Sequence, residues 1–199
     1  MSIGILALQG DFAAHAEALA RLGAETSLVK TAEEVLAAGA IVLPGGESTT
    51  MWKLMEGTGI PEALVAAAQA GKPVYGTCAG AILLARTVTN PDGQGLGVLD
   101  ATVQRNAYGR QLDSTVLSLT DVNTRVLGDA PMEAVFIRAP RFAAVGPGVE
   151  VLARREGSPV LVRQANILAA TFHPELTGDD RVAKLFLESV AGAGRKAAA

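Results

Sequence analysis

The chain contains a single cysteine, Cys78, whose neighbours are typical of a reactive nucleophile. Residues 72–84 read KPVYGTCAGAILL, so a short apolar strand leads into Gly-Thr-Cys-Ala-Gly and an Ala/Leu-rich helix follows. This is the strand–turn–helix order of a nucleophile elbow, in which Gly76 and Gly80 permit a cramped backbone. The positive end of the helix would favour the thiolate, which is the nucleophilic form. A buried, inert cysteine is the alternative that this segment alone leaves open.

The second chemically informative segment holds His173, one of only two histidines. It ends an apolar run, and Pro174 biases it toward an extended conformation. Because residues two apart in an extended segment face the same way, Glu175 can approach the imidazole. A carboxylate that binds one ring nitrogen orients the other toward a sulfur. We therefore expect a Cys78–His173–Glu175 triad, with an exposed histidine beside a surface glutamate as the alternative.

The other histidine, His15, is the rival base. It lies in a predicted helix over residues 12–22, among alanines. We expect it on the partly exposed flank of that helix, and we rank it below His173 because no carboxylate accompanies it at extended spacing. The apolar stripe of the helix is assigned to Phe12, Ala16, Leu19, Ala20 and Leu22.

A third segment could bind an anion through its backbone. Residues 43–50 read LPGGESTT, and the adjacent Gly45 and Gly46 let N–H groups converge. In an enzyme that forms a thioester, the anion is the tetrahedral oxyanion. A phosphate loop is the competing function, but neither G-x-x-x-x-G-K-[ST] nor an early G-x-G-x-x-G occurs. A tight strand-to-helix turn is the structural alternative.

Alternating apolar strands and helices are expected to position these segments. The run at residues 3–8 is continuously apolar, as in a strand buried on both faces of a parallel sheet. The alternation that follows indicates a doubly wound α/β sheet, in which ligands bind outside the carboxyl ends of the strands. The loops at Gln9–Gly10, 44–50 and 76–80 should therefore meet at one edge. The expected elements are strands at 24–29, 40–43 and 74–77, and helices opened by a Thr31 capping box, by Ser48 and by Pro61.

The second half of the chain predicts shorter strands. Residues 90–97 are rich in turn formers, and hairpins beyond them would add an antiparallel extension to the sheet. We expect a final helix at 179–190, one domain over residues 1–191 and a flexible tail at 192–199. The expected strands are 98–103, 115–119, 134–137, 149–152, 160–162 and 167–172.

Composition narrows the function classes. The chain has 199 residues, 49% hydrophobic and 19% charged, which suits one globular domain with a large core. A net charge of −3 offers no argument for nucleic acid or an anionic membrane. The lone cysteine excludes an internal disulfide and a cysteine-based zinc site. With no basic N-terminal region and no long apolar stretch, we expect a soluble cytoplasmic protein.

Together, the three motifs resemble those of class I glutamine amidotransferase domains. Four further segments narrow the likeness to the glutaminase subunits of pyridoxal 5′-phosphate synthases, the PdxT type, from residue 3 to about residue 190. Several such blocks in one order are far more specific than any one of them. The segments are LALQG at 6–10, RNAYGRQ at 105–111, FIRAP at 136–140 and HPELT at 173–177.

This resemblance implies a flavodoxin-like, three-layer mixed sheet and the hydrolysis of L-glutamine to glutamate and ammonia through a cysteinyl thioester. The ammonia would pass to a synthase subunit, which combines it with ribose 5-phosphate and glyceraldehyde 3-phosphate. No cofactor, metal, nucleic acid or membrane is implied for the glutaminase subunit itself. A glutaminase for another pathway, such as imidazole glycerol phosphate synthesis, a non-catalytic binding module and a general cysteine esterase are the alternatives.

The resemblance also implies residue roles. Cys78 would be the nucleophile, and His173 with Glu175 would supply the base. Two departures from the family pattern, Ala14 in place of Glu and Thr115 in place of Phe, do not touch the triad. Glutamine would bind to Gly46, Glu47, Ser48, Arg105, Ile137 and Arg138. The oxyanion-hole candidates are Gly45, Gly46, Ala79, Gln9 and Gly10.

Overall fold

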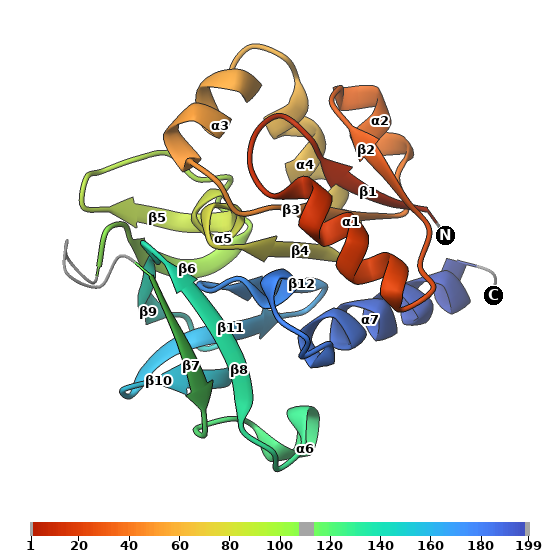
Figure 1. Cartoon of the computed structure of the whole chain (residues 1–199). Coiled ribbons are helices and arrows are strands. Elements are labelled where there is room, and N and C mark those ends of the chain that lie inside the picture. The colour runs from red at the N-terminus through yellow and green to blue at the C-terminus, as the bar shows by residue number, and fades with distance from the viewer. Residues whose placement is uncertain (1, 108–113, 198–199) are drawn as a thin grey trace.

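A seven-stranded sheet forms the centre of the structure, a computed structural model that describes residues 2–107 and 114–197 (Figure 1). Its strand order is β10-β11-β12-β4-β3-β1-β2. The five strands from β12 to β2 run parallel, and β11 and β10 add an antiparallel edge. The expected doubly wound sheet with an antiparallel extension is therefore confirmed. The strands are β1 (Ile3–Leu6), β2 (Thr26–Val29), β3 (Ala40–Leu43), β4 (Val74–Thr77), β10 (Glu150–Arg155), β11 (Ser158–Gln164) and β12 (Ile167–Ala170).

Helices cover both faces of this sheet and create two separate cores (Figure 1). One face carries α1 and α7, whose Leu19 and Phe186 pack with Ile5. The other face carries α2 to α5, and Met51 and Leu83 pack there with the sheet. Burial on both faces explains why the central strands read as continuous apolar runs. The helices are α1 (Phe12–Arg21), α2 (Ala32–Ala37), α3 (Ser48–Met55), α4 (Ile60–Gln69), α5 (Ala79–Leu84) and α7 (Arg181–Ala197).

The N-terminal cap predicted for α2 is confirmed, whereas the cap predicted for α3 is wrong. Thr31 and Glu34 form the expected capping box at α2. The cap of α3 is Glu47, whose carboxylate accepts from the backbone N–H groups of Thr49 and Thr50, and not Ser48 as expected. Ser48 is instead the first helical residue, because a carboxylate one position earlier can reach both free N–H groups.

The second half of the chain contains two smaller sheets beside the large one. Strands β5, β6 and β9 form the first, and β7 pairs with β8 in a hairpin whose connection contains α6. Strands β5 and β9 were not among the strands expected from the sequence. The elements are β5 (Ala85–Thr89), β6 (Leu99–Gln104), β7 (Ser114–Leu119), α6 (Thr124–Leu127), β8 (Met132–Ile137) and β9 (Arg141–Val145).

The C-terminal helix is longer than expected. Helix α7 runs to Ala197, so residues 192–197, assigned above to a tail, are helical. Two glycines at 192 and 194 suggested an end to the helix. The surrounding Ala, Arg and Lys residues are strong helix formers and outweigh that cost, which is about 1 kcal/mol per glycine. None of the helices in the described parts of the chain is long and apolar enough to cross a membrane.

The turn between β4 and α5 depends on very close packing of backbone against backbone. A Cβ atom at Gly80 would lie 2.1 Å from the carbonyl oxygen of Leu43 on β3. A Cβ atom at Gly76 would lie 2.9 Å from the Gly80 carbonyl group. Glycine at both positions therefore lets α5 begin directly against the neighbouring strand, which sets the position of Cys78 between them.

We predict that Gly80→Ala destabilises the fold by about 1–3 kcal/mol, because the added methyl group meets backbone that cannot move aside cheaply. The higher helix propensity of alanine would by itself stabilise α5. A loss of stability therefore indicates that the steric clash of the methyl group outweighs helix propensity. The free energy of unfolding in urea measures it. Gly148→Ala is the matched control, since nothing lies within 4 Å of a Cβ atom there. Equal stability of both variants would contradict the packing argument.

Candidate active site

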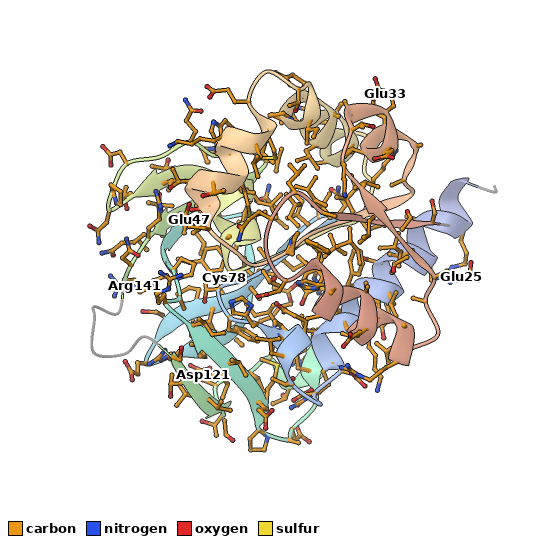
Figure 2. The ribbon with its side chains drawn as sticks, turned by 45° about the horizontal axis from the view of Figure 1, so that its top comes forward. Glu25, Glu33, Glu47, Cys78, Asp121 and Arg141 are labelled. Atoms are coloured by element: carbon orange, nitrogen blue, oxygen red, sulfur yellow. The ribbon has the colours of Figure 1, made fainter. Side chains whose placement is uncertain are left out.

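Cys78 lies between β4 and α5 in a conformation that side chains rarely adopt. Its φ is 48° and its ψ is −103°, and its N–H donates to the carbonyl oxygen of Ala170 on β12 at 2.8 Å. Strained dihedral angles of this kind persist only where surrounding structure enforces them, and they cluster at functional sites. The expected nucleophile elbow is thus present, with the sulfur near the middle of the molecule (Figure 2).

His173 and Glu175 come together after β12. Nδ1 of His173 lies 2.8 Å from Oε1 of Glu175, and both side chains are buried. The contact was expected, but its stated cause was wrong. Glu175 lies in a 3₁₀ turn, Pro174–Leu176, and not in an extended segment, so the turn brings the carboxylate back to the ring.

The imidazole of His173 also interacts with Cys78, which contributes to the pKa of the ring. Since Nδ1 is engaged by Glu175, Nε2 is the ring nitrogen left to interact with the sulfur. Burial lowers the pKa of His173, but the hydrogen bonds and charges of Cys78 and Glu175 outweigh burial and raise it to about 10. The ring is therefore protonated at neutral pH and carries a proton that it can transfer.

Glu175 is ionised beside this ring. Burial raises the pKa of the Glu175 carboxyl, but the two neighbouring histidines, His15 and His173, lower it below its ordinary value. The hydrogen bond from His173 contributes to the same shift. The opposite charges of the buried imidazolium and carboxylate stabilise one another. Either charge buried alone in this interior would be strongly destabilising.

The second glycine loop packs directly against the triad. A Cβ atom at Gly45 would lie 2.3 Å from Cε1 of His173, so glycine is what allows the imidazole to lie this close to the loop. The carbonyl oxygen of Gly45 accepts a hydrogen bond from the N–H of Asp11 at 3.0 Å. Asp11 itself is half-exposed, with Oδ2 3.8 Å from Nδ1 of His173. Asp11 was not among the site residues expected from the sequence.

His15 lies at the triad, contrary to our expectation of a partly exposed flank. Its side chain is buried, and Nε2 lies 2.9 Å from Oγ1 of Thr77 and 3.4 Å from Oε1 of Glu175. The buried face of α1 contains His15, Ala18 and Leu19. This i, i+3, i+4 spacing is typical of a buried helix face, but the predicted apolar face contained Ala16 and Ala20 and not His15 and Ala18.

A cavity of about 230 Å³ opens above the sulfur, and its size suits a ligand smaller than a typical drug molecule. Cys78 and His173 line it, and Figure 2 shows Glu47 near Cys78. All six residues proposed for glutamine binding line the same cavity. Its other lining residues are Gln9, Asp11, Ile82, Asn106 and Pro140.

The oxyanion-hole candidates divide into two groups. Gly46 and Gln9 line the cavity, whereas Gly45, Gly10 and Ala79 do not. Oε1 of Gln9 accepts a hydrogen bond from the N–H of Glu47 at 2.8 Å, so the Gln9 side chain lies against the glycine loop. Gly10 has a φ of 102°, and a Cβ atom there would overlap the Gly45 carbonyl oxygen. The two loops are therefore in direct contact.

Charged groups at the mouth of the cavity are already partly paired. Nη2 of Arg105 donates to Oγ1 of Thr49 at 2.8 Å and lies 3.4 Å from Oε1 of Glu47. Burial raises the pKa of Glu47, but hydrogen bonds from Thr50 and Thr49 lower it below its ordinary value. A cation and an anion thus face the same space. The rest of the 105–111 block, from residue 108, lies outside the described residues.

Asp11, His173 and Glu175 also bring three possible metal ligands within 4.8 Å of one another. Nδ1 of His173 is already bonded to Glu175, however, and Asp11 is half-exposed. The cluster is explained by an ion pair, and we assign no metal to it.

Comparison with known proteins agrees with this geometry. A sequence profile of the SNO glutamine amidotransferase family matches residues 5–192. The chain belongs to this family. Over 190 residues it is 54% identical to a protein from Koribacter versatilis named pyridoxal 5'-phosphate synthase subunit PdxT, covering 96% of each chain. A protein of the same name from Thermotoga neapolitana is 50% identical, covering 96% of this chain and all of the relative.

Solved structures support the same family. One described as a glutamine amidotransferase has a TM-score of 0.87 and 48% identity, covering 95% of this chain and 98% of its own. PurLQS from Thermotoga maritima, at 17% identity and a TM-score of 0.70, covers 96% of this chain and 97% of its own. At that identity the likeness shows the fold alone. The class I amidotransferase fold expected from the motifs is confirmed.

We predict that Glu175→Gln lowers the pKa of His173 from about 10 by about one to three pH units, because an opposite charge and its hydrogen bond are removed. NMR titration of the His173 ring measures this, with Glu25→Gln on the surface as control. A pKa raised above the ordinary 6.5 stabilises the fold below that pH and ceases to do so as the pH rises through about 10. The native chain should therefore lose more stability across this range than the variant. An unchanged His173 titration would refute the pairing.

Proposed function

We propose that this chain is a glutaminase that hydrolyses L-glutamine to glutamate and ammonia and delivers the ammonia to the synthase subunit of a pyridoxal 5′-phosphate synthase. The observation that carries the proposal is the linked series Cys78, His173 and Glu175, in which Cys78 and His173 line a cavity that is also lined by a carboxylate and a guanidinium. The names of the relatives at 50–54% identity support the choice of pathway.

In the first step, the Cys78 sulfur attacks the side-chain amide carbon of glutamine and forms a tetrahedral intermediate. The C–N bond then breaks, and the imidazolium of His173 gives its proton to the departing nitrogen, which leaves as ammonia. A γ-glutamyl thioester remains on Cys78. The raised pKa of His173 suits this step, because the ring already holds the proton.

In the second step, neutral His173 accepts a proton from a water molecule as the oxygen attacks the thioester carbon. The carbon–sulfur bond breaks, glutamate forms and the thiolate returns. Glu175 stabilises the imidazolium after each proton transfer and does not itself take part in the transfer. The backbone N–H groups of Gly46 and Ala79 are proposed to bind the oxyanion of each tetrahedral intermediate. Loss of one such donor typically costs about a hundredfold or more in rate.

The ends of the substrate explain the remaining polar residues. Glutamine carries an α-ammonium and an α-carboxylate, and the cavity offers Glu47 to the first and Arg105 with Arg138 to the second. Glu47 is ionised and held in place by the N-terminus of α3, so its orientation is set before the substrate arrives. The backbone at Gly46, Ser48 and Ile137 completes the proposed contacts.

A partner is needed because ammonia released into water is lost. The loop at Gln9–Gly10 contacts the Gly45–Gly46 loop and binds the N–H of Glu47 through its side chain. We propose that docking of the synthase subunit rearranges this loop and completes the oxyanion site. A cytoplasmic location is part of the proposal, since an unpaired nucleophilic cysteine suits a reducing compartment.

We predict that ammonia release from glutamine falls by at least about a thousandfold in Cys78→Ala, because removal of one triad member abolishes the covalent route. Native and variant chains are assayed with the synthase subunit present, and their unfolding curves are compared to exclude misfolding. Iodoacetamide should label the native chain at Cys78 at neutral pH. A native chain that neither releases ammonia nor reacts would favour a non-catalytic binding module.

We predict, further, that adding the synthase subunit raises the turnover of the native chain, because the Gln9–Gly10 loop is then rearranged. Steady-state ammonia release is measured at several ratios of the two subunits. Equal rates for the isolated chain and the complex would rule out activation by docking while leaving the glutaminase reaction intact.

A further inference from the structure

A second histidine lies beside the carboxylate of the proposed triad. Nε2 of His15, on α1, lies 3.4 Å from the same Glu175 oxygen that binds His173. The same nitrogen lies 2.9 Å from Oγ1 of Thr77, the residue immediately before Cys78. His15 therefore contacts both the carboxylate and the strand end that carries the nucleophile. It does not line the cavity proposed for glutamine.

His15 is neutral where His173 is charged. Burial lowers the pKa of His15 and outweighs the opposing effect of the Glu175 charge, and the nearby His173 lowers it further. A neutral ring carries one N–H and one lone pair. A lone pair on Nε2 would be repelled by the Glu175 carboxylate, which lies 3.4 Å away. The stable tautomer therefore carries the proton on Nε2, and this N–H donates to Thr77.

The orientation of the His15 ring is restrained from several directions. Its edge meets the face of Tyr75 in a T-shaped contact with ring centroids 5.6 Å apart. Helix α1 is anchored to the core one turn further on by Leu19. An apolar side chain at position 15 could fill this space without the cost of burying an imidazole, so a polar side chain here calls for a polar role.

We propose that His15 is a positioning residue: its Nε2–H donates to Thr77, and the positive end of this N–H, with Nε2 3.4 Å from Oε1 of Glu175, holds the carboxylate electrostatically against His173. The inference rests on the proposed function, because positioning matters only if His173 transfers protons. Without His15, Glu175 is expected to leave its place on Nδ1 of His173, so that the imidazole is no longer aimed at the sulfur. Misplacement by about 1 Å can cost about a hundredfold in rate.

The test compares three substitutions in the full chain, assayed for ammonia release with the synthase subunit. His15→Phe keeps an aromatic ring, which is larger than the imidazole, and removes the donor. His15→Leu is the second apolar variant, should the larger ring prevent folding. His15→Gln replaces the donor, since a glutamine amide nitrogen can reach the position of Nε2. Leu19→Ala is the matched control, because it weakens the packing of the same helix in the core without removing a polar group from beside Glu175.

We expect His15→Phe to lower kcat by about tenfold to a hundredfold while KM for glutamine stays within about twofold. The acid-side midpoint of kcat should move to higher pH, because Glu175 protonates more readily without the adjacent N–H. The titratable groups that face His15 are Glu175, His173, Asp11, Tyr75, Asp179 and Asp180. His15→Gln should restore most of kcat and the midpoint. Leu19→Ala should lower the unfolding temperature and leave both kcat and the acid-side midpoint unchanged.

An NMR measurement separates this inference from the proposed function. The Nδ1–H proton of His173, bonded to a carboxylate, should give a far-downfield signal in the native chain, in His15→Gln and in Leu19→Ala. It should broaden or disappear in His15→Phe. If that signal and kcat persist in His15→Phe, or if Leu19→Ala loses both equally, the positioning role is overturned. A native chain with the signal but without ammonia release would overturn the proposed function instead.

Discussion

The buried pair of His173 and Glu175 is the interaction on which the site depends. A carboxylate that is 6% exposed and an imidazole that is 3% exposed could not stay charged singly in this interior. Together they keep an imidazolium beside the sulfur at neutral pH. The cysteine, the elbow and the cavity would have no proton donor without this pair. The reaction proposed for the chain therefore rests on one hydrogen bond of 2.8 Å.

The fold assembles the site around this pair by bringing three loops together at the carboxyl ends of adjacent strands. Cys78 follows β4 and His173 follows β12, which are hydrogen-bonded neighbours, while the glycine loop follows β3 on the other side. Contacts between these loops leave no room for a Cβ atom at Gly45 or Gly80. The glycines thus serve close approach between backbones and rings, in addition to any role in binding an anion.

Two histidines share one carboxylate and differ in charge because their surroundings differ. His173 faces the sulfur and the carboxylate, and its pKa is raised to about 10. His15 is more deeply enclosed by the α1 side of the core, and burial lowers its pKa. This division leaves a single mobile proton in the site, on the ring that faces the cavity.

Features that depend on local chemistry could be predicted from the amino-acid sequence. The glycines around Cys78, the order His-Pro-Glu and the alternation of apolar runs with helix caps were enough to predict the turn at Cys78, the contact between His173 and Glu175, and the parallel sheet. The sequence could not decide contacts between distant segments, because a helix pattern does not say which polar residue on its buried face meets another loop. The tertiary structure placed His15 against Glu175, assigned β5 and β9 to a separate sheet and gave the α3 cap to Glu47. Each of these follows from packing between segments that local propensity does not describe.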